Sequence, residues 1–419
     1  MTIRSVTGAR FLIIVAALSV LFFFARLFPY VERPTAGFMA YYTSGKLLLN
    51  HYDMTMLYSQ KQFHDIIPVI SGSNVEDEYR ANPPILSMVF LPFAFFTAAK
   101  AKLLWEIFSL CCLIFSLILF KKYFILNTNQ FIAITGLTFA LMPLYVNFVY
   151  GQLYAVLLLL QILLLIFWKS QKKILASLAL VLMLSLKGYG VLFLLLAALL
   201  NEWLIIVWSG VGYGLIVAGS SFLLGMKTWL EYFNALKTLL TSSAPAVTFQ
   251  QNIQSFTGFL VEKAGGNSHS TIIVSVIIIF LFCATVAILY ILSKRMPAWR
   301  LEIPFSFAAI GGVLFAPQLF DYHYSLLLIP IVIILVELSH AQTKFELIGF
   351  GFALFLLSAK IPYYYPIFQN TWLWIAGFPR IYGAIILLWL LIRIAVRFEP
   401  AKTSTSEGVS NALPAPSNI

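Results

Sequence analysis

Two basic side chains, Lys187 and Arg80, could together bind an anionic group. Lys187 interrupts a run that is otherwise apolar from Ile174 to Leu200. A charge in such a run is costly unless it meets water, a carboxylate or a phosphate. The compact ammonium group of Lys187 would clamp an anionic headgroup. Arg80, just before the bend Asn82-Pro83-Pro84, would supply a second cation. Together they suit a lipid-linked phosphate, although a lysine that snorkels at a helix turn also explains Lys187.

A second group of polar residues would suit a sugar. Asp321 and His323 flank Tyr322, and both types of side chain can bond to a sugar or a diphosphate. Asn252 lies in the amide-rich segment 250–255, and Gln152 follows a glycine. Amides pair well with sugar hydroxyls, but these side chains could instead satisfy neighbouring loop amides.

Familiar catalytic motifs are missing from the sequence. It contains no P-loop, no GxGxxG and no HExxH, so neither a glycine-rich phosphate loop nor a zinc protease helix is indicated. The acidic trio Glu76-Asp77-Glu78 is interpreted as part of a solvated loop. We therefore predict no metal site and no cofactor.

The composition requires a membrane. Of the 419 residues, 61% are hydrophobic and only 10% are charged, whereas soluble proteins carry roughly 25% charged residues. The net charge of +11 does not indicate nucleic-acid binding, because the basic residues collect in short loops between apolar runs. That distribution is typical of the cytoplasmic side of a membrane protein.

The apolar runs predict an all-α protein with about twelve transmembrane helices. Each run approaches the ~20 residues that cross the hydrocarbon. We expect a single polytopic domain over residues 1–398 and a disordered cytoplasmic tail over 399–419, which is rich in polar residues and proline. The predicted spans are 11–29, 104–120, 130–148, 153–168, 174–186, 189–200, 204–225, 271–293, 304–320, 325–339, 345–360 and 381–398.

Positive charges orient these spans. If every basic cluster is cytoplasmic, both termini lie in the cytoplasm and the run 83–96 is a re-entrant or short helix. The alternative lets that run cross the membrane and places Lys169, Lys172 and Lys173 outside. The first arrangement gathers the unusual polar residues on the outer face. It also gives outer loops at 30–83 and 226–270, in which we expect interfacial helices.

Several of these residues, in this order, resemble glycosyltransferase family 87, one of the GT-C-type membrane enzymes. Between about residues 30 and 330, the resemblance rests on the segment from Phe38 to Lys46, then Tyr58, Asn82-Pro83-Pro84, Gly151-Gln152, Lys187, Trp203, Asn252-Ile253-Gln254-Ser255 and Asp321-Tyr322-His323-Tyr324.

The resemblance implies a GT-C-type bundle in the plasma membrane. Its activity would transfer a sugar, often mannose, from a polyprenyl-phosphate donor to a lipid or glycolipid acceptor on the outer face. A carboxylate would act as general base on the acceptor hydroxyl. By the same resemblance, Lys187 and Arg80 would contact the donor phosphate, and Gln152, Asn252 and His323 would line the site.

One position departs from the family pattern. In the family, an acidic residue precedes the Phe at the start of the first outer loop. In this sequence that position holds Gly37, and glycine cannot accept a proton. Another carboxylate, such as Asp321 or Glu32, could serve. The base could be dispensable for an anionic acceptor, or the protein could bind a lipid-linked sugar or a partner without catalysis. A lipid or sugar transporter is disfavoured, since no pair of interrupted helices recurs.

Overall fold

The computed structural model describes residues 3–72, 74–80, 82–241, 250–265, 270–296, 300–316, 319–340, 343–360 and 366–397. Every regular element within these ranges is a helix. The predicted disordered tail, 399–419, lies outside the described residues.

Every predicted span coincides with one or two helices. These are α1 (Ile3–Leu27), α5 (Ala98–Tyr123), α6 (Thr128–Ala140), α7 (Met142–Val149), α8 (Tyr154–Lys169), α9 (Lys173–Lys187), α10 (Val191–Leu199), α11 (Trp203–Leu224), α14 (Ser270–Arg295), α15 (Glu302–Leu314), η4 (Asp321–Leu327), α16 (Leu328–His340), α17 (Lys344–Ser358) and α19 (Pro379–Arg397).

Their lengths support fewer crossings than twelve. Within the described chain, six helices are long and apolar enough to cross a membrane. A seventh results if α6 and α7, bent by 54° at Leu141, form one span. The helices α8 and α15 are apolar but shorter. The structure is therefore that of a helical membrane protein, and the predicted count of twelve spans is not confirmed.

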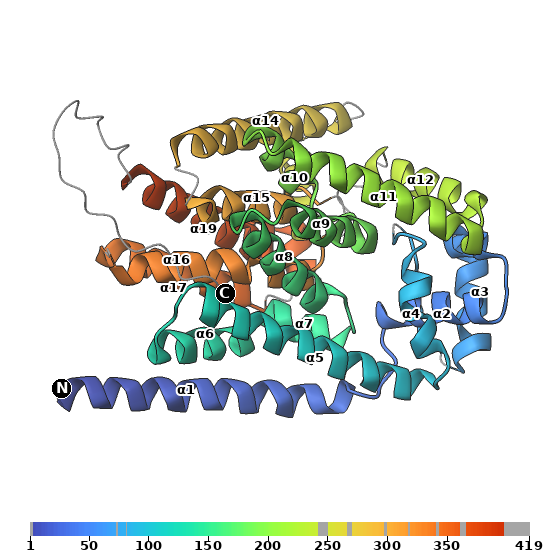
Figure 1. The fold of residues 1–419 in the computed structure, drawn as a ribbon, viewed down its shortest axis with the longest axis horizontal. Helices are drawn as coiled ribbons and strands as arrows, with labels where there is room; N and C mark the ends of the chain where they lie inside the picture. Colours follow the sequence, from blue (N-terminus) through green and yellow to red (C-terminus); the bar gives the residue numbers. More distant parts are fainter. Residues whose placement is uncertain are drawn as a thin grey trace.

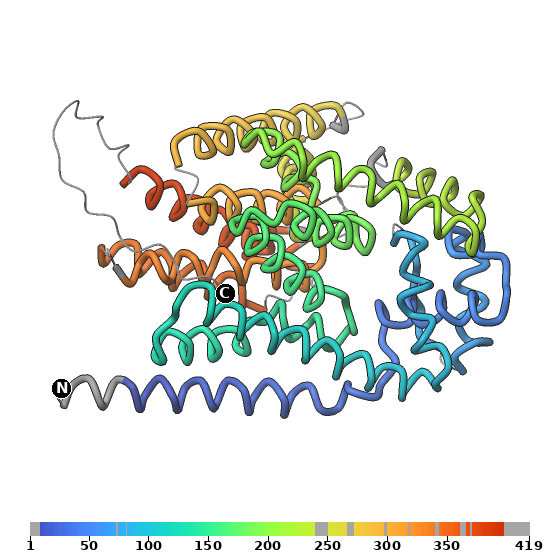
Figure 2. The backbone as a smooth tube through the Cα atoms, in the orientation of Figure 1, coloured from blue at the N-terminus to red at the C-terminus, as the bar shows by residue number. Residues whose placement is uncertain are grey.

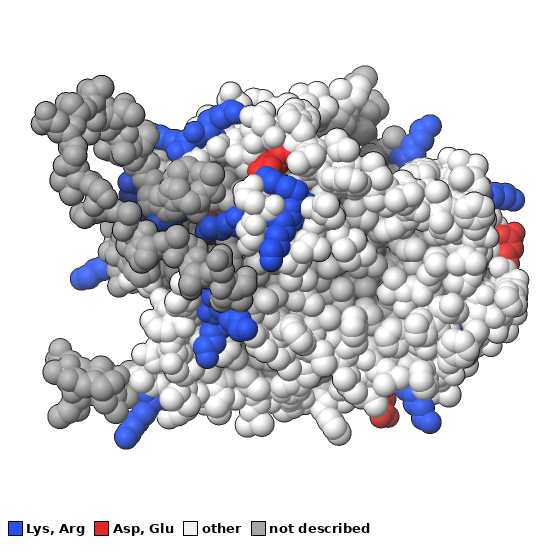
Figure 3. Space-filling model, viewed as in Figure 1, with Lys and Arg blue, Asp and Glu red and all other residues white. Residues whose placement is uncertain are grey.

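The long helices run in roughly the same direction (Figure 1). The helix α1 packs along α6 at one edge of the bundle, and α14 covers the opposite edge. The continuous backbone trace shows the N-terminus at one end of the bundle and the first loop, after α1, at the other (Figure 2). Many Lys and Arg side chains lie over the half that contains the N-terminus, next to a broad uncharged band (Figure 3).

Short helices form a cluster at the end opposite the N-terminus (Figure 1). It contains α2 (Phe38–Leu49), η2 (Met54–Tyr58), α3 (Gln60–Ser71) and α4 (Leu86–Ala94). The nine-residue α4 is too short to cross a membrane, and it packs on α2. The two backbones meet closely at Gly45, where a Cβ atom would lie 2.7 Å from the carbonyl oxygen of Phe90.

The segments 30–83 and 226–270, which the sequence predicts to be outer loops, carry further helices. The helix α3 buries Phe63 and Ile67 on one face and exposes polar residues on the other. In the second segment, α12 (Met226–Thr241) packs against η2, and α13 (Ile253–Lys263) packs against α14. The remaining described helices are α18 (Pro366–Asn370), η5 (Trp372–Gly377) and η1 (Phe28–Tyr30).

Candidate active site

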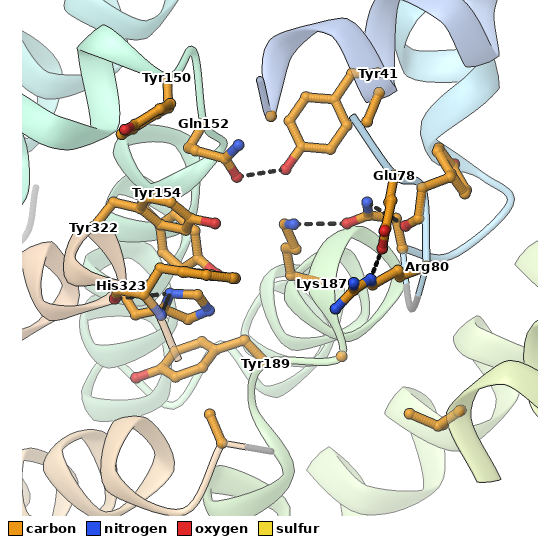
Figure 4. A pocket seen from close by; sticks show the side chains of 18 of the residues that line it. Tyr41, Glu78, Arg80, Tyr150, Gln152, Tyr154, Lys187, Tyr189, Tyr322 and His323 are labelled. Carbon is orange, nitrogen blue, oxygen red and sulfur yellow. Dashed lines mark hydrogen bonds and ion pairs between the residues drawn. The ribbon is translucent and has the colours of Figure 1, made fainter. Parts of the chain in front are cut away.

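A cavity of about 1630 Å³ lies between the short-helix cluster and the ends of the long helices. Its walls come from the start of α2, the segment 76–82, the turn between α9 and α10, α12, and η4. Segments that are far apart in the sequence therefore meet around one space. Figure 4 shows this space with the side chains that surround it.

Lys187 is a central cation of the cavity. It is the last residue of α9, which ends at Gly188 in a left-handed conformation. The Lys187 Nζ donates a hydrogen bond of 2.6 Å to Asn82 Oδ1 and lies 5.1 Å from the centre of the Tyr41 ring (Figure 4). The half-buried ammonium group retains donors for a further acceptor, because a lysine has three N–H bonds.

Asp77 brings a carboxylate to the start of α2. Its Oδ2 accepts hydrogen bonds from the backbone N–H groups of Gly37, at 2.5 Å, and Ala40, at 2.7 Å. Its Oδ1 accepts one from Glu78 N at 2.9 Å. The positive end of the α2 dipole favours a negative charge here. The interpretation of residues 76–78 as a solvated loop is therefore wrong for Asp77, which lines the cavity.

The environment of Asp77 tunes its acidity. Burial raises the pKa of this carboxyl from its ordinary value of 3.8 to about 7, against the backbone hydrogen bonds of Ala40 and Gly37 and the charge of Lys187, which lower it. A pKa near neutrality is what a general base needs at physiological pH.

Both the backbone conformation and the neighbouring side chain at position 37 require a glycine there. Its φ of 89° and ψ of −55° lie outside the regions that side chains with a Cβ tolerate. A Cβ atom would also sit 1.9 Å from Gln152 Nε2. That amide is 2% exposed, and its Oε1 accepts a 2.7 Å hydrogen bond from the Tyr41 hydroxyl (Figure 4). The Gln152 side chain thus occupies the space that a side chain at position 37 would need.

A buried network holds the turn that carries Gln152. Trp105 Nε1 donates to the carbonyl oxygen of Gly151 at 2.9 Å, and Lys102 Nζ donates to that of Phe148 at 2.9 Å. Lys102 also pairs with Glu106, one turn further along α5. Because these partners are buried and come from a long helix, the position of Gln152 is fixed with respect to the bundle.

Aromatic residues form the wall opposite Lys187 (Figure 4). The His323 ring centre lies 4.5 Å from that of Tyr154 and stacks on Tyr322 at 4.9 Å. Beside these rings, Asp321 also lines the cavity and forms an ion pair of 3.0 Å with Arg380, whose side chain is 1% exposed. Flat aromatic faces beside polar groups suit a sugar ring, which presents C–H bonds on its faces and hydroxyls at its edge.

Comparison with known proteins gives the family of this chain. The model of glycosyltransferase family 87 matches residues 81–317, more than half of the chain. The chain belongs to glycosyltransferase family 87. Neither the curated proteins nor the solved structures gave a match. Family 87 indicates a membrane glycosyltransferase, which requires a sugar donor and an acceptor.

Five of the seven residues predicted for the site line the cavity. These are Arg80, Gln152, Lys187, Asp321 and His323. Arg80 lies at the rim, where it is exposed and pairs with Glu78.

The other two predicted residues lie elsewhere. Glu32 is exposed and does not line the cavity. Asn252 is 1% exposed, accepts from Ser255 N at 2.7 Å and donates to the carbonyl oxygen of Ala316 at 3.1 Å. It therefore caps α13 and ties it to the segment after α15.

Sequence reasoning missed three residues at or beside the site: Tyr41, Asp77 and Arg380. Tyr41 and Asp77 precede the part of the chain that the family 87 model matches. A signal for Asp77 was present in the unusual density of acidic residues at 76–78, but nothing in the sequence shows which of them turns inward. Arg380 follows a proline at the start of an apolar helix, and an arginine there needs a partner.

Proposed function

We propose that this protein is an integral membrane glycosyltransferase that uses a polyprenyl-phosphate sugar as donor. The acceptor is a lipid or glycolipid, and the sugar is a hexose, with mannose as the first candidate. The observation that carries the proposal is the half-buried Lys187 ammonium group, which faces a large cavity that also has an apolar wall.

The apolar wall supports a lipid-linked donor. Val191, Phe233 and Phe282 line the cavity and are 62%, 44% and 37% exposed. A lipid chain can therefore lie along these three apolar side chains and extend from the side of the bundle into the bilayer. The phosphate at its end would reach Lys187, whose charge would stabilise the negative charge that develops as the phosphate departs.

The remaining polar residues are assigned around this phosphate. Arg80, at the rim, would provide a second phosphate contact. Gln152 and His323 would contact the sugar, and Asn252 would support the site through α13. Asp321 and Glu32 remain the carboxylates proposed from sequence. Asp321 is engaged by Arg380, and Glu32 lies away from the cavity.

The arrangement in the membrane follows from charge. Basic residues in the last turns of α5, α14 and α19 are assigned to the cytoplasm, as the positive-inside rule expects. Both termini are then cytoplasmic, and the cavity, near the opposite end, faces the outer side of the plasma membrane.

Reconstitution tests this proposal. The purified protein, in lipid nanodiscs, would receive a radiolabelled polyprenyl-phosphate mannose and a membrane lipid extract, and a new labelled glycolipid would be sought. Lys187→Met keeps the aliphatic stem but removes the charge, so we expect turnover to fall by about 10²–10³-fold, as when one donor that stabilises developing charge is removed. The matched control is Lys344→Met, at an exposed position at the start of α17.

The outcomes separate the hypotheses. Full turnover in Lys187→Met would reject the phosphate role. Donor binding without any product, across the available acceptors, would favour a non-catalytic protein that binds a lipid-linked sugar. Movement of intact donor across a sealed vesicle would favour a transporter.

A further inference from the structure

Position 37, at the start of α2, carries no carboxylate, but a later residue of the same loop brings one to it. Gly37, at the start of α2, cannot accept a proton. Forty residues later in the chain, Asp77 places its Oδ2 on the backbone N–H groups of Gly37 and Ala40. The carboxylate of Asp77 therefore lies next to Gly37, the residue at which this sequence departs from the pattern it resembles, and both residues line the cavity.

We propose that Asp77 is the catalytic carboxylate of this enzyme, which takes the proton from the acceptor hydroxyl. The proposal rests on the glycosyl transfer proposed above. It goes beyond it by assigning the base to a residue on a different segment from the one that carries it in the family.

The hydrogen bonds of Asp77 orient the group and leave it able to react. Each carboxylate oxygen has two lone pairs. Both lone pairs of Oδ2 are occupied by the two α2 amides, whereas Oδ1 accepts one bond, from Glu78 N. One lone pair of Oδ1 therefore remains for a hydroxyl group. Because three backbone donors fix the carboxylate, it needs no reorganisation to receive the proton.

The other acidic groups of the cavity are less suited. Asp321 is ion-paired with the buried Arg380, so a proton on it would weaken that pair. Glu78 pairs with Arg80 and accepts a 2.6 Å hydrogen bond from Gln60 Nε2. Asp65 and Glu76 also line the cavity, but both are exposed, and the α2 amides that hold Asp77 bond to neither of them.

The reaction balances with these groups. The acceptor hydroxyl gives its proton to Asp77 Oδ1 while its oxygen bonds to the anomeric carbon of the sugar. The bond from that carbon to the phosphate oxygen breaks, and its electron pair stays on the oxygen. Polyprenyl phosphate leaves with one additional negative charge, which Lys187 faces. Asp77 then returns the proton to water.

Asp77→Asn tests the proposal because the amide oxygen can still accept from Gly37 N and Ala40 N. The cap of α2 is preserved and the proton acceptor is lost, together with the bond from Glu78 N, because the amide nitrogen that replaces Oδ1 cannot accept it. We expect donor affinity and thermal stability to stay near those of the wild type, with turnover reduced by about 10²–10⁴-fold, the usual contribution of a general base. Asp77→Glu keeps a carboxylate and should recover part of the activity.

The matched control is Asp53→Asn in the same outer loop. Asp53 caps η2 by accepting from Thr55 N at 2.9 Å, does not line the cavity, and Asn caps equally well. It should keep wild-type turnover. Full turnover in Asp77→Asn, or loss of donor binding together with activity, would assign Asp77 a structural role and overturn the inference. A wild-type protein that binds donor but transfers nothing would instead reject the proposed function, and the role of Asp77 with it.

Discussion

Replacing Gly37 by aspartate would restore the acidic residue that the resemblance to family 87 implies at this position, yet we expect it to damage the protein. From the sequence alone, Gly37→Asp should raise transfer, because it returns a missing base. The structure reverses that expectation, since the space beside Gly37 is filled by Gln152 and the role of the carboxylate is filled by Asp77.

The free energy of unfolding that Gly37→Asp costs has two parts, and the structure allows us to estimate both. A side chain forced into the Gly37 conformation, with φ of 89° and ψ of −55°, costs about 1–3 kcal/mol. Its Cβ must displace Gln152 Nε2, only 1.9 Å away. Moving that amide breaks its bond to the Tyr41 hydroxyl, and leaving a buried partner unsatisfied costs about 1–3 kcal/mol. The sum is roughly 2–6 kcal/mol.

The added charge makes the effect on catalysis worse. A second carboxylate beside Asp77 raises the pKa of Asp77 further, because two like charges in one place resist ionisation. Less Asp77 would then be ionised at neutral pH. We expect Gly37→Asp to lose turnover as well as stability.

A double-mutant cycle isolates the steric part. The free energy of unfolding would be measured by SDS titration in mixed micelles for Gly37→Ala, Gln152→Ala and the double variant. Gly37→Ala should cost less in the Gln152→Ala background, by about 1–3 kcal/mol, because the obstacle is gone and Tyr41 has already lost its partner. The conformational cost should remain.

Two results would refute this reasoning. A Gly37→Asp protein that is as stable as the wild type, with higher turnover, would show that position 37 accepts a carboxylate that acts as the base. Purely additive effects of Gly37→Ala and Gln152→Ala would show that the two residues do not compete for space.

Two further predictions concern charged groups. Burial raises the pKa of Asp77 to about 7, and only its ionised form accepts a proton. In the wild type, kcat/KM should therefore fall as the pH drops through about 7. The pH profile of Asp77→Asn should lack this fall. The raised pKa means that the folded protein binds this proton more tightly than the unfolded chain, so the contribution of Asp77 to stability declines as pH rises from about 4 to 7, opposite to activity. Arg380→Met should lower the free energy of unfolding by about 3–5 kcal/mol, because it strands Asp321, and SDS titration should show partial recovery with Asp321→Asn.

The positions of the helices could be predicted from the sequence because each depends on local apolar composition. All twelve predicted runs fall on helices, and the short α4 lies within 83–96, where a re-entrant or short helix was expected. The number of crossings could not be predicted in the same way. A helix such as α10, of nine residues, is apolar enough to suggest a span, but only packing decides whether it crosses.

Part of the site was also accessible from sequence. A charge such as Lys187 in an apolar run requires a partner, so its importance follows from solvation alone. Asp77 could not be recognised in this way, because it lies in a polar segment where an acidic residue costs nothing. Its role depends on a contact with residues 37 and 40, which only the folded chain brings close.

Gly37 and Asp77 therefore work together to place one carboxylate at the start of α2. A carboxylate carried by residue 37 itself would be fixed by the conformation of a single loop residue. A carboxylate carried by Asp77 is fixed by the N-terminal amides of α2, and its position depends on α2 and the segment 74–80 together. Lys187 binds Asn82, just beyond that segment, and its charge lowers the pKa of Asp77. Donor phosphate at Lys187 would weaken this effect and raise the pKa of Asp77, so the pH below which kcat falls should lie above the pH below which kcat/KM falls.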